Sequence, residues 1–236
     1  MTEFTTWRSL VDGAVISDIP DSVVHHYDAS VDTRSLGTVS SIPDIEGSTD
    51  LESGSEVTLI DNGINSNISY ETDGAGDYLR FDGPSITPPW TFIAVIRIES
   101  SNRQMFFDRG GGGRGGSNGA IEFIDPTNDI RYRPTGDTTD DQVQVTDFDA
   151  VNNSFVMVVE QLESSSRLRL RDDTVSEASE SGDSAAWGDE IIDMFRDERD
   201  QRYIEGLTAE IAIANSEFDS ELQDFEDDLL QKWGIN

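Results

Sequence analysis

A glycine-rich run between two strand-like stretches has the most unusual residue types in this chain. Arg109 and Arg114 border and interrupt the glycines of residues 110–119, and Asn118 comes near the end of the run. A phosphate-binding P-loop would need a lysine followed by serine or threonine after its last glycine, and then a helix, and this run has neither. Glycine frees the backbone but costs entropy to order. We therefore predict a long hairpin loop that is either idle or a contact loop, in which Arg109, Arg114 and Asn118 meet a neighbouring subunit or a glycan.

Histidine and tryptophan are the other side chains with chemistry of interest. His25 and His26 are adjacent in an apparent strand and so face opposite ways, which predicts one buried and one exposed histidine. With no third histidine and no cysteine in the chain, the sequence does not predict a transition-metal site. Trp187 lies in a polar stretch and is the candidate for stacking on a sugar ring, whereas Trp90 and Trp233 are predicted to lie in the core.

The charge of the chain indicates its surroundings. There are 48 acidic residues against 16 cationic ones, of which only Lys232 is a lysine, and the formal net charge is −32. Self-repulsion of this size weakens a compact state unless molar salt screens charges beyond roughly 3 Å. Arginine fits such a medium because its guanidinium is weakly hydrated and holds carboxylates bidentately. We expect a halophilic protein that does not bind nucleic acid, since it would repel phosphates and high salt would weaken every phosphate contact.

Short β-type runs separated by glycine, aspartate, asparagine and serine predict the elements that position these residues. The predicted strands are residues 23–27, 56–60, 78–81, 90–98, 104–107, 120–124, 130–133, 143–145, 155–160, 167–171 and 210–214. Residues 90–98 are nearly continuously apolar, which is typical of a central strand covered on both faces. Residues 167–171 alternate leucine with arginine, which predicts a half-buried strand whose arginines face solvent or carboxylates.

One helix is predicted, over residues 217–233, from apolar residues at helical spacing, with Ser216 as its cap and Gly234 as its terminator. Many short strands with one closing helix predict an all-β fold of two antiparallel sheets packed face to face. We expect residues 1–24 to be an N-terminal lead-in, either a strand on the main domain or a docking segment, and residues 25–236 to be one domain. The chain shows no export signal and no apolar run of membrane-spanning length, so neither secretion by the usual signals nor membrane insertion is predicted.

Several stretches form a set of recognisable motifs, at residues 26–30 (HYDAS), 78–83 (YLRFDG), 90–98, 105–110, 155–160, 167–173, 204–214 (IEGLTAEIAIA), 218–230 and 232–235 (KWGI). Together these stretches resemble concanavalin A-like, laminin G-like jelly-roll domains. The tail looks like the closing signature of such domains in phage and bacterial surface proteins. Together with the halophilic composition, the resemblance implies a virion structural or surface protein of a haloarchaeal tailed virus: a head decoration, turret or fibre component.

The resemblance also implies where catalytic carboxylates would stand. Laminarinase-type members carry them on one strand as E-x-D-x-x-E or E-x-D-x-E, and a retaining pair lies about 5–5.5 Å apart. No predicted strand has either pattern, and the pairs Glu122 with Asp125 and Glu190 with Asp193 are three residues apart, on opposite faces of a strand. We therefore expect solvated surface acids and a protein that is not an enzyme. A glycoside hydrolase or a free-standing glycan-binding lectin of the same fold are the alternatives.

The remaining expectations concern cofactors and partners. The family often carries calcium at a sheet edge, so a structural calcium ion held by Asp108 and residues 137–141 stays open, and no other cofactor is predicted. The expected partners are other virion proteins, further copies of the chain in a homo-oligomer, and host cell-surface glycans. The expected location is the virion, in an extracellular high-salt environment.

Overall fold

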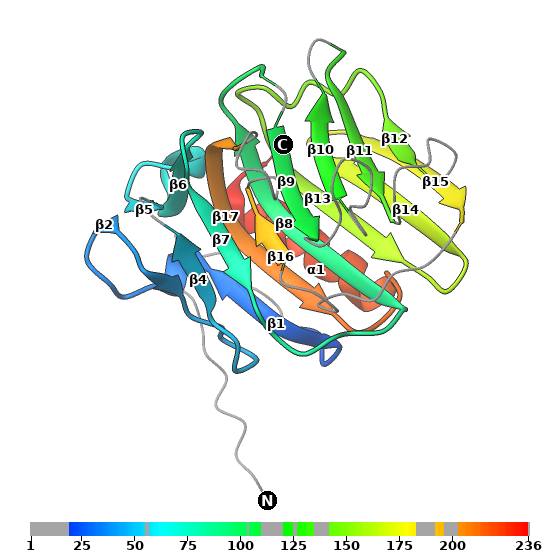
Figure 1. Ribbon diagram of the computed structural model, residues 1–236, viewed down its shortest axis with the longest axis horizontal. Coiled ribbons are helices and arrows are strands. Elements are labelled where there is room, and N and C mark those ends of the chain that lie inside the picture. The colour runs from blue at the N-terminus through cyan, green and yellow to red at the C-terminus, as the bar shows by residue number, and fades with distance from the viewer. Residues whose placement is uncertain are drawn as a thin grey trace, which may run out of the picture.

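Two antiparallel β-sheets pack face to face, and one helix covers the outer face of the larger sheet (Figure 1). The computed structural model describes residues 19–54, 57–102, 104–109, 120–124, 127–134, 142–182, 192–195 and 203–235. The prediction of an all-β sandwich with a C-terminal helix is confirmed. Residues 1–18 of the expected lead-in lie outside the described residues, so its boundary stays a prediction.

The larger sheet has nine strands. Eight of them follow the order β15, β14, β13, β8, β17, β6, β5 and β2. The ninth, β1, pairs with the second half of β17, and β6 pairs with the first half. Their bounds are β1 Val23–Asp28, β2 Gly37–Thr38, β5 Thr58–Ile60, β6 Ser69–Asp73, β8 Trp90–Ile98, β13 Ser154–Gln161, β14 Ser165–Arg171, β15 Val175–Ser181 and β17 Glu205–Ala214. A short 3-10 turn, Ala29–Val31, follows β1, and a second, Ile64–Ser66, separates β5 from β6.

The smaller sheet has eight strands, in the order β12, β11, β10, β9, β16, β7, β4 and β3. Their bounds are β3 Ser41–Ile42, β4 Leu51–Gly54, β7 Tyr78–Phe81, β9 Gln104–Arg109, β10 Ala120–Ile124, β11 Asp129–Arg133, β12 Val143–Val145 and β16 Ile192–Met194. Among the described residues, no helix is long and apolar enough to cross a membrane.

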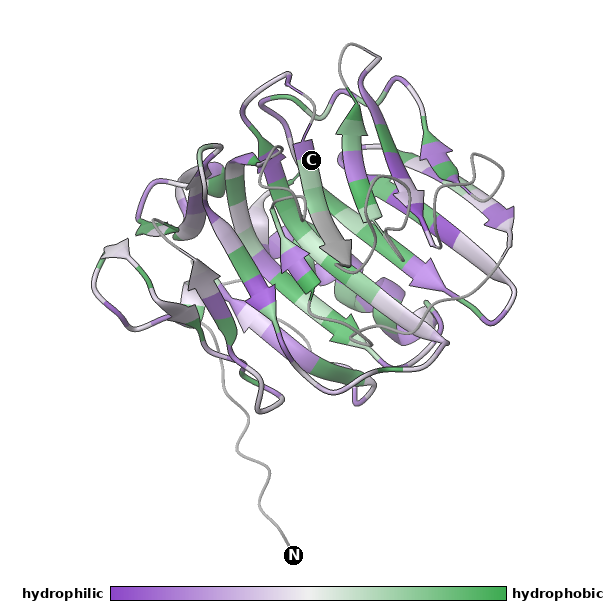
Figure 2. Cartoon of the chain, viewed as in Figure 1, coloured by the Kyte–Doolittle hydropathy of each residue, from purple (hydrophilic) through white to green (hydrophobic). Residues whose placement is uncertain are grey.

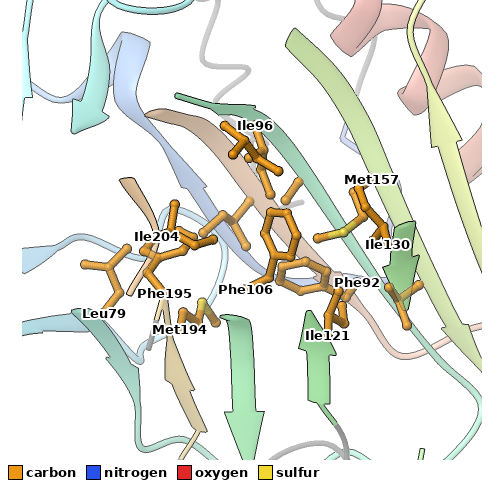
Figure 3. Close-up of a cluster of buried hydrophobic side chains, with 14 of the residues drawn as sticks. Leu79, Phe92, Ile96, Phe106, Ile121, Ile130, Met157, Met194, Phe195 and Ile204 are labelled. Carbon is orange, nitrogen blue, oxygen red and sulfur yellow. The ribbon is translucent and has the colours of Figure 1, made fainter. Parts of the chain in front are cut away.

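Hydrophobic residues form two clusters, one on each face of the nine-stranded sheet. Between the sheets, side chains such as Phe92 and Met157 meet Phe106 and Ile121 from the opposite sheet (Figure 3). The second cluster lies between the nine-stranded sheet and the helix. Figure 2 shows the hydrophobic residues concentrated along the central strands. Each fully buried large side chain of this kind contributes about 1.5–3 kcal/mol relative to an exposed one.

The two strands with the clearest sequence patterns have the predicted surroundings. Successive residues of β8 alternate between the two clusters: Phe92 and Ala94 face the other sheet, while Ile93 and Val95 face the helix. This strand is central and covered on both faces, and Trp90 lies in the core as predicted. In β14 the leucines are buried and the arginines are half-buried, which confirms the alternating pattern.

The helix, α1, spans Ser220–Trp233 and begins three residues later than predicted. The predicted cap Ser216 is wrong, because Oδ1 of Asp219 accepts the backbone N–H groups of Glu221 at 3.0 Å and Leu222 at 3.1 Å. Aspartate is as good an N-cap as serine, and its charge also favours the helix N-terminus. Gly234 ends the helix as predicted, in the left-handed conformation at φ 62°.

Three arginines of β14, Arg167, Arg169 and Arg171, form what we call the arginine stripe, and two of them hold α1 against the sheet. Arg167 pairs with Glu160 at 3.0 Å, while Arg169 and Arg171 both pair with Glu226 of α1 at 3.0 Å. The stripe therefore faces carboxylates rather than open solvent, one of the two predicted arrangements.

Candidate functional site

Five side chains with polar atoms meet beneath α1, and we call them the buried polar cluster: His26, Asp28, Glu210, Lys232 and Trp233. β1 and β17 pair so that Asp28 lies opposite Glu210, and the last turn of α1 brings Lys232 and Trp233 to the same place. None of the five is more than 6% exposed. The only lysine of the chain is thus placed in its interior.

Hydrogen bonds occupy both oxygens of Glu210. Oε1 accepts from Nε2 of His26 at 2.6 Å, and Oε2 accepts from Nζ of Lys232 at 2.6 Å and Nε1 of Trp233 at 2.7 Å. The same ammonium group donates to Oδ2 of Asp28 at 2.6 Å. Buried charges are tolerated only when they are paired in this way, so the cluster ties β1, β17 and α1 together.

The cluster has the composition of a metal site but already holds a cation. Ligand atoms of His26, Asp28 and Glu210 lie within 4.8 Å of one another. However, Nζ of Lys232 is 2.6 Å from both carboxylates, so the ammonium supplies the positive charge that a metal ion would bring. A metal ion would have to displace this lysine in a fully buried place. The arrangement therefore serves to hold the helix on the sheet.

The prediction that one of the two histidines is exposed is wrong. His25 is 5% exposed and His26 is 1% exposed, because both faces of β1 are covered. The ring of His25 lies edge-on to Phe81, with centroids 5.0 Å apart, and the ring of His26 lies edge-on to Phe225 of α1 at 6.0 Å. Nδ1 of His25 also contacts Oδ2 of Asp44 at 2.7 Å. Alternation along the strand was correctly inferred, but it does not reveal that a helix covers the second face.

Burial and neighbouring charges shift the pKa values within the cluster. Burial alone would lower the pKa of His26, but the hydrogen bond that it donates to Glu210 and the charges of Glu210 and Asp28 outweigh burial and raise that pKa above 6.5. Burial would raise the pKa of Glu210, but the charge of Lys232 and the hydrogen bond from His26 lower it to about 2. The two carboxylates therefore favour the protonated, cationic form of His26.

Loss of the proton from His26 should make the protein less stable as the pH rises above 6.5. A raised pKa contributes stability that is complete below the unfolded value of 6.5 and is lost as the pH rises through the folded value. We expect the free energy of unfolding to fall by up to about 1.4 kcal/mol per pH unit in that window. Urea unfolding at molar salt across this range measures the slope. His26→Gln should remove it and His25→Asn should keep it; an unchanged slope in His26→Gln would contradict this assignment.

Ion pairs cross the outer face of the eight-stranded sheet. Arg80 of β7 donates to Asp193 of β16 at 2.8 Å, and Glu122 of β10 accepts from Nε of Arg131 at 2.9 Å and pairs with Arg133 at 3.2 Å. The expectation that Glu122 is a solvated surface acid is wrong, because it is 2% exposed and paired with two guanidinium groups. Asp193 is paired as well, and its expected companion Glu190, like Asp125, lies outside the described residues.

Five strand ends meet at one end of the eight-stranded sheet, and we call this place the loop end. Arg109 at the end of β9 pairs with Ile192 at the start of β16, which pairs in turn with Phe81 at the end of β7. On the other side, Ala120 at the start of β10 pairs with Asp108 of β9 and Arg133 of β11. The chain segments that begin or end at these strand ends therefore leave the sheet at the same place.

The sequence-predicted site residues belong to these segments. The backbone of Arg109 closes β9 at the loop end, while Arg114 and Asn118 of the predicted contact loop lie outside the described residues, between β9 and β10. Trp187 also lies outside them, in the segment that leads into β16. Of the expected calcium ligands, residues 137–141 lie outside the described residues, and for Asp108 the structure gives the backbone position in β9. These assignments stay predictions.

A small acidic cavity lies at the end of the nine-stranded sheet formed by β2, β5 and β6, the end farthest from β15. It has a volume of about 220 Å³ and is lined by Thr38, Thr58, Glu71, Asp73 and Asp77. No pattern in the sequence indicates this cavity, because it forms only where β2, β5 and β6 pair in register. Oδ2 of Asp77 accepts the backbone N–H of Asp73 at 2.8 Å, which holds the turn after β6 in place.

Comparisons with known proteins find similarity in structure only. No protein-family model matches the sequence, and no curated protein matches it. Trypanosoma rangeli sialidase in complex with sialic acid has a TM-score of 0.58 and 10% identity, over 96% of this chain and 36% of the sialidase chain. The binding domain of botulinum neurotoxin DC in complex with SialylT has a TM-score of 0.59 and 11% identity, over 92% of this chain and 52% of that one. The chain thus spans about a third to a half of these structures, and the likeness establishes a jelly-roll-like β-sandwich.

The sialidases correct the prediction that this protein is not an enzyme. That prediction depended on the absence of a strand with paired carboxylates, which is the requirement of most glycoside hydrolases. Sialidases are an exception because they use a tyrosine nucleophile, so a search for carboxylate pairs does not test for their chemistry. Since the same sandwich occurs within a sialidase chain, neither the fold nor the missing motif excludes catalysis.

Proposed function

We propose that the protein recognises glycans through the loop end of the eight-stranded sheet, on the surface of a haloarchaeal tailed virus particle. The observation that carries the proposal is the meeting of five strand ends there, because segments far apart in the sequence can then contribute to one binding surface. Similar structures were solved with sialic acid and with SialylT, which makes acidic glycans the first ligands to test.

The residue types in these segments suit acidic sugars. Arg109 and Arg114 supply guanidinium groups that hold a carboxylate bidentately, and Trp187 supplies an aromatic face for a sugar ring. Within the described part of the sheet, Arg80, Arg131 and Arg133 are already paired with carboxylates. An acidic ligand is therefore expected to depend on the arginines of the segment between β9 and β10.

A glycan array at molar salt, followed by calorimetry with the best ligand, tests this proposal. We expect R109A/R114A and W187A each to weaken binding about tenfold or more, since a charge-assisted hydrogen bond contributes roughly 1.5–3 kcal/mol. R97A is the matched control, because Arg97 is a half-buried arginine of the other sheet that pairs with Glu99. Absence of binding to every glycan, or equal losses in the control, would reject glycan recognition at this place.

Glycoside hydrolysis is the second candidate, favoured by the sialidases among the similar structures. The same preparation should be incubated with sialylated oligosaccharides in molar salt, and free sialic acid should be measured over time. Release that depends on protein concentration and is lost in R109A/R114A would support catalysis at the loop end. Binding without release would leave recognition as the function of this chain.

The proposed high-salt setting predicts salt-dependent stability. With a net charge of −32, transfer from molar salt to about 0.1 M salt lengthens the screening distance from about 3 Å to about 10 Å and strengthens repulsion. We expect the Tm to fall on this transfer, as measured by circular dichroism. An unchanged Tm would argue against the halophilic interpretation, and mass spectrometry of purified particles would test the virion location directly.

A further inference from the structure

Strand β15 is the longest edge strand among the described parts of the two sheets. The outer side of β1, of six residues, is partly covered, because His26 O accepts the N–H of Ile45 and the N–H of His26 donates to Asp44. The remaining edges are formed by β2 and β3, of two residues each, and by β12, of three residues. Very short edge strands are a common protection against pairing with another chain. β15 has seven residues, forms the margin of the nine-stranded sheet in Figure 1, and contains neither lysine nor proline. Its pairing with β14 has no register shift, so no bulge protects this edge either.

The backbone of β15 offers its outer hydrogen-bonding groups. The N–H of Gly182 donates to Ser164 O at 3.1 Å, on the β14 side. Because N–H groups alternate in direction along a strand, those of Ser181, Ser179 and Glu177 point away from β14. Most of the strand is exposed, including Ser179 and Val175, the latter at 50%. In the described structure β15 pairs only with β14.

We propose that two copies of this chain pair through β15, antiparallel and centred on Ala178, so that the two nine-stranded sheets become continuous. In this register Glu177, whose backbone N–H points outward, lies opposite Ser179 of the partner subunit. No two glutamates are then directly opposite each other. A shift that centres the pair on Glu177 would place like charges directly opposite, which is destabilising. The charge pattern of the strand therefore disfavours the alignment centred on Glu177 and is compatible with the one centred on Ala178.

The charges behind this edge favour a second copy. Strands β14 and β15 together carry three arginines and two glutamates, and the arginines are shared with Glu160, Glu226 and Asp227 of neighbouring elements. Arg167 lies beside Ser179 in register, and Arg169 lies beside Glu177 and pairs with it at 3.1 Å. In the proposed pair, each Glu177 lies between its own Arg169 and, across one serine, Arg167 of the partner subunit. These arginines offset part of the repulsion between two acidic copies at this edge, and molar salt screens the rest.

Light scattering and sedimentation equilibrium at molar salt test the proposal. We expect a dimer whose fraction rises with salt concentration. Ser179→Glu puts a carboxylate opposite Glu177 of the partner subunit, twice by symmetry, and should weaken the dimer about tenfold or more. Ser179→Pro removes an outward N–H group and should also give a monomer. Both variants should keep the Tm of a folded monomer, because Ser179 is exposed and its neighbour Arg167 accommodates a carboxylate.

Two further variants separate this interface from general charge effects. Ser101→Glu adds the same charge at an exposed position between β8 and β9, and it should remain dimeric. The exchange E177S/S179E moves the carboxylate to the opposite side of the pair and should restore the dimer that Ser179→Glu weakens. A wild-type protein that is monomeric in molar salt would overturn the proposal. So would an oligomer that is unaffected by both Ser179 variants, or an exchange that fails to restore pairing.

Discussion

Replacement of Lys232 by methionine is expected to lower the free energy of unfolding by about 3–5 kcal/mol, as the removal of one member of a buried ion pair typically does. Methionine fills a similar length, so packing changes little. The loss instead comes from Asp28 and Glu210, whose carboxylates each lie 2.6 Å from the ammonium group in the native protein. In the variant these buried carboxylates would have one cation fewer to pair with. Urea unfolding at constant molar salt measures the difference.

A rescue variant distinguishes charge from packing in this experiment. K232M/D28N/E210Q removes the two carboxylate charges together with the ammonium and should recover most of the lost stability, since a neutral polar group costs much less to bury than an unpaired charge. The rescue variant also supplies a folded sample if Lys232→Met alone does not fold. If Lys232→Met were as stable as the native protein, the lysine would not be what holds α1 on β1 and β17.

Replacement of Glu226 by alanine should be similarly costly, about 3–5 kcal/mol. Its carboxylate is fully buried beneath α1 and accepts from Arg169 through both oxygens, at 3.0 and 3.2 Å, and from Arg171 at 3.0 Å. Without it, two half-buried guanidinium groups lose a shared partner, and, among the described residues, the helix keeps only the exposed pair between Asp227 and Arg171 as an ionic contact with β14. Thermal and urea unfolding at molar salt should show the loss in Tm and in midpoint.

Glu177→Ala is the matched control, because Glu177 pairs with the same Arg169 at 3.1 Å but its side chain is 36% exposed. Exposed ion pairs contribute roughly 0–1 kcal/mol, so this variant should lose little. Two carboxylates on one arginine would then differ several-fold in effect, because Glu226 is buried and also binds Arg171, whereas Glu177 is exposed. Equal losses in the two variants would show that burial does not decide the strength of this network.

The strands that could be predicted from the sequence are those whose pattern reflects burial. β8 and β14 have a continuous and an alternating apolar pattern, and each has the predicted surroundings. Strands β2, β3, β4, β6, β15 and β16 escaped prediction, since they are short or rich in serine, aspartate and glutamate and resemble loops when read alone. Pairing with a neighbouring strand holds them in the sheet, and that neighbour is distant in the sequence.

The buried polar cluster could not be predicted for a similar reason. Lys232 is the only lysine, and His26 and Asp28 lie in the family-like stretch of residues 26–30. No pattern in the sequence, however, indicates that these three residues contact Glu210. The contact between Lys232 and Asp28 joins residues 204 positions apart. Local periodicity reports which face of an element is apolar, and it does not report which charged groups meet across elements.

That same separation constrains the order of events during synthesis. A ribosome-bound chain that has not yet emerged through residue 232 contains β1 and β17 but not the ammonium group that neutralises Asp28 and Glu210. Closing the sheet around those carboxylates at that stage would bury negative charge with no lysine to oppose it. The nascent sandwich should therefore stay open along β1 until α1 arrives, which makes docking of the helix a late, committing step of folding.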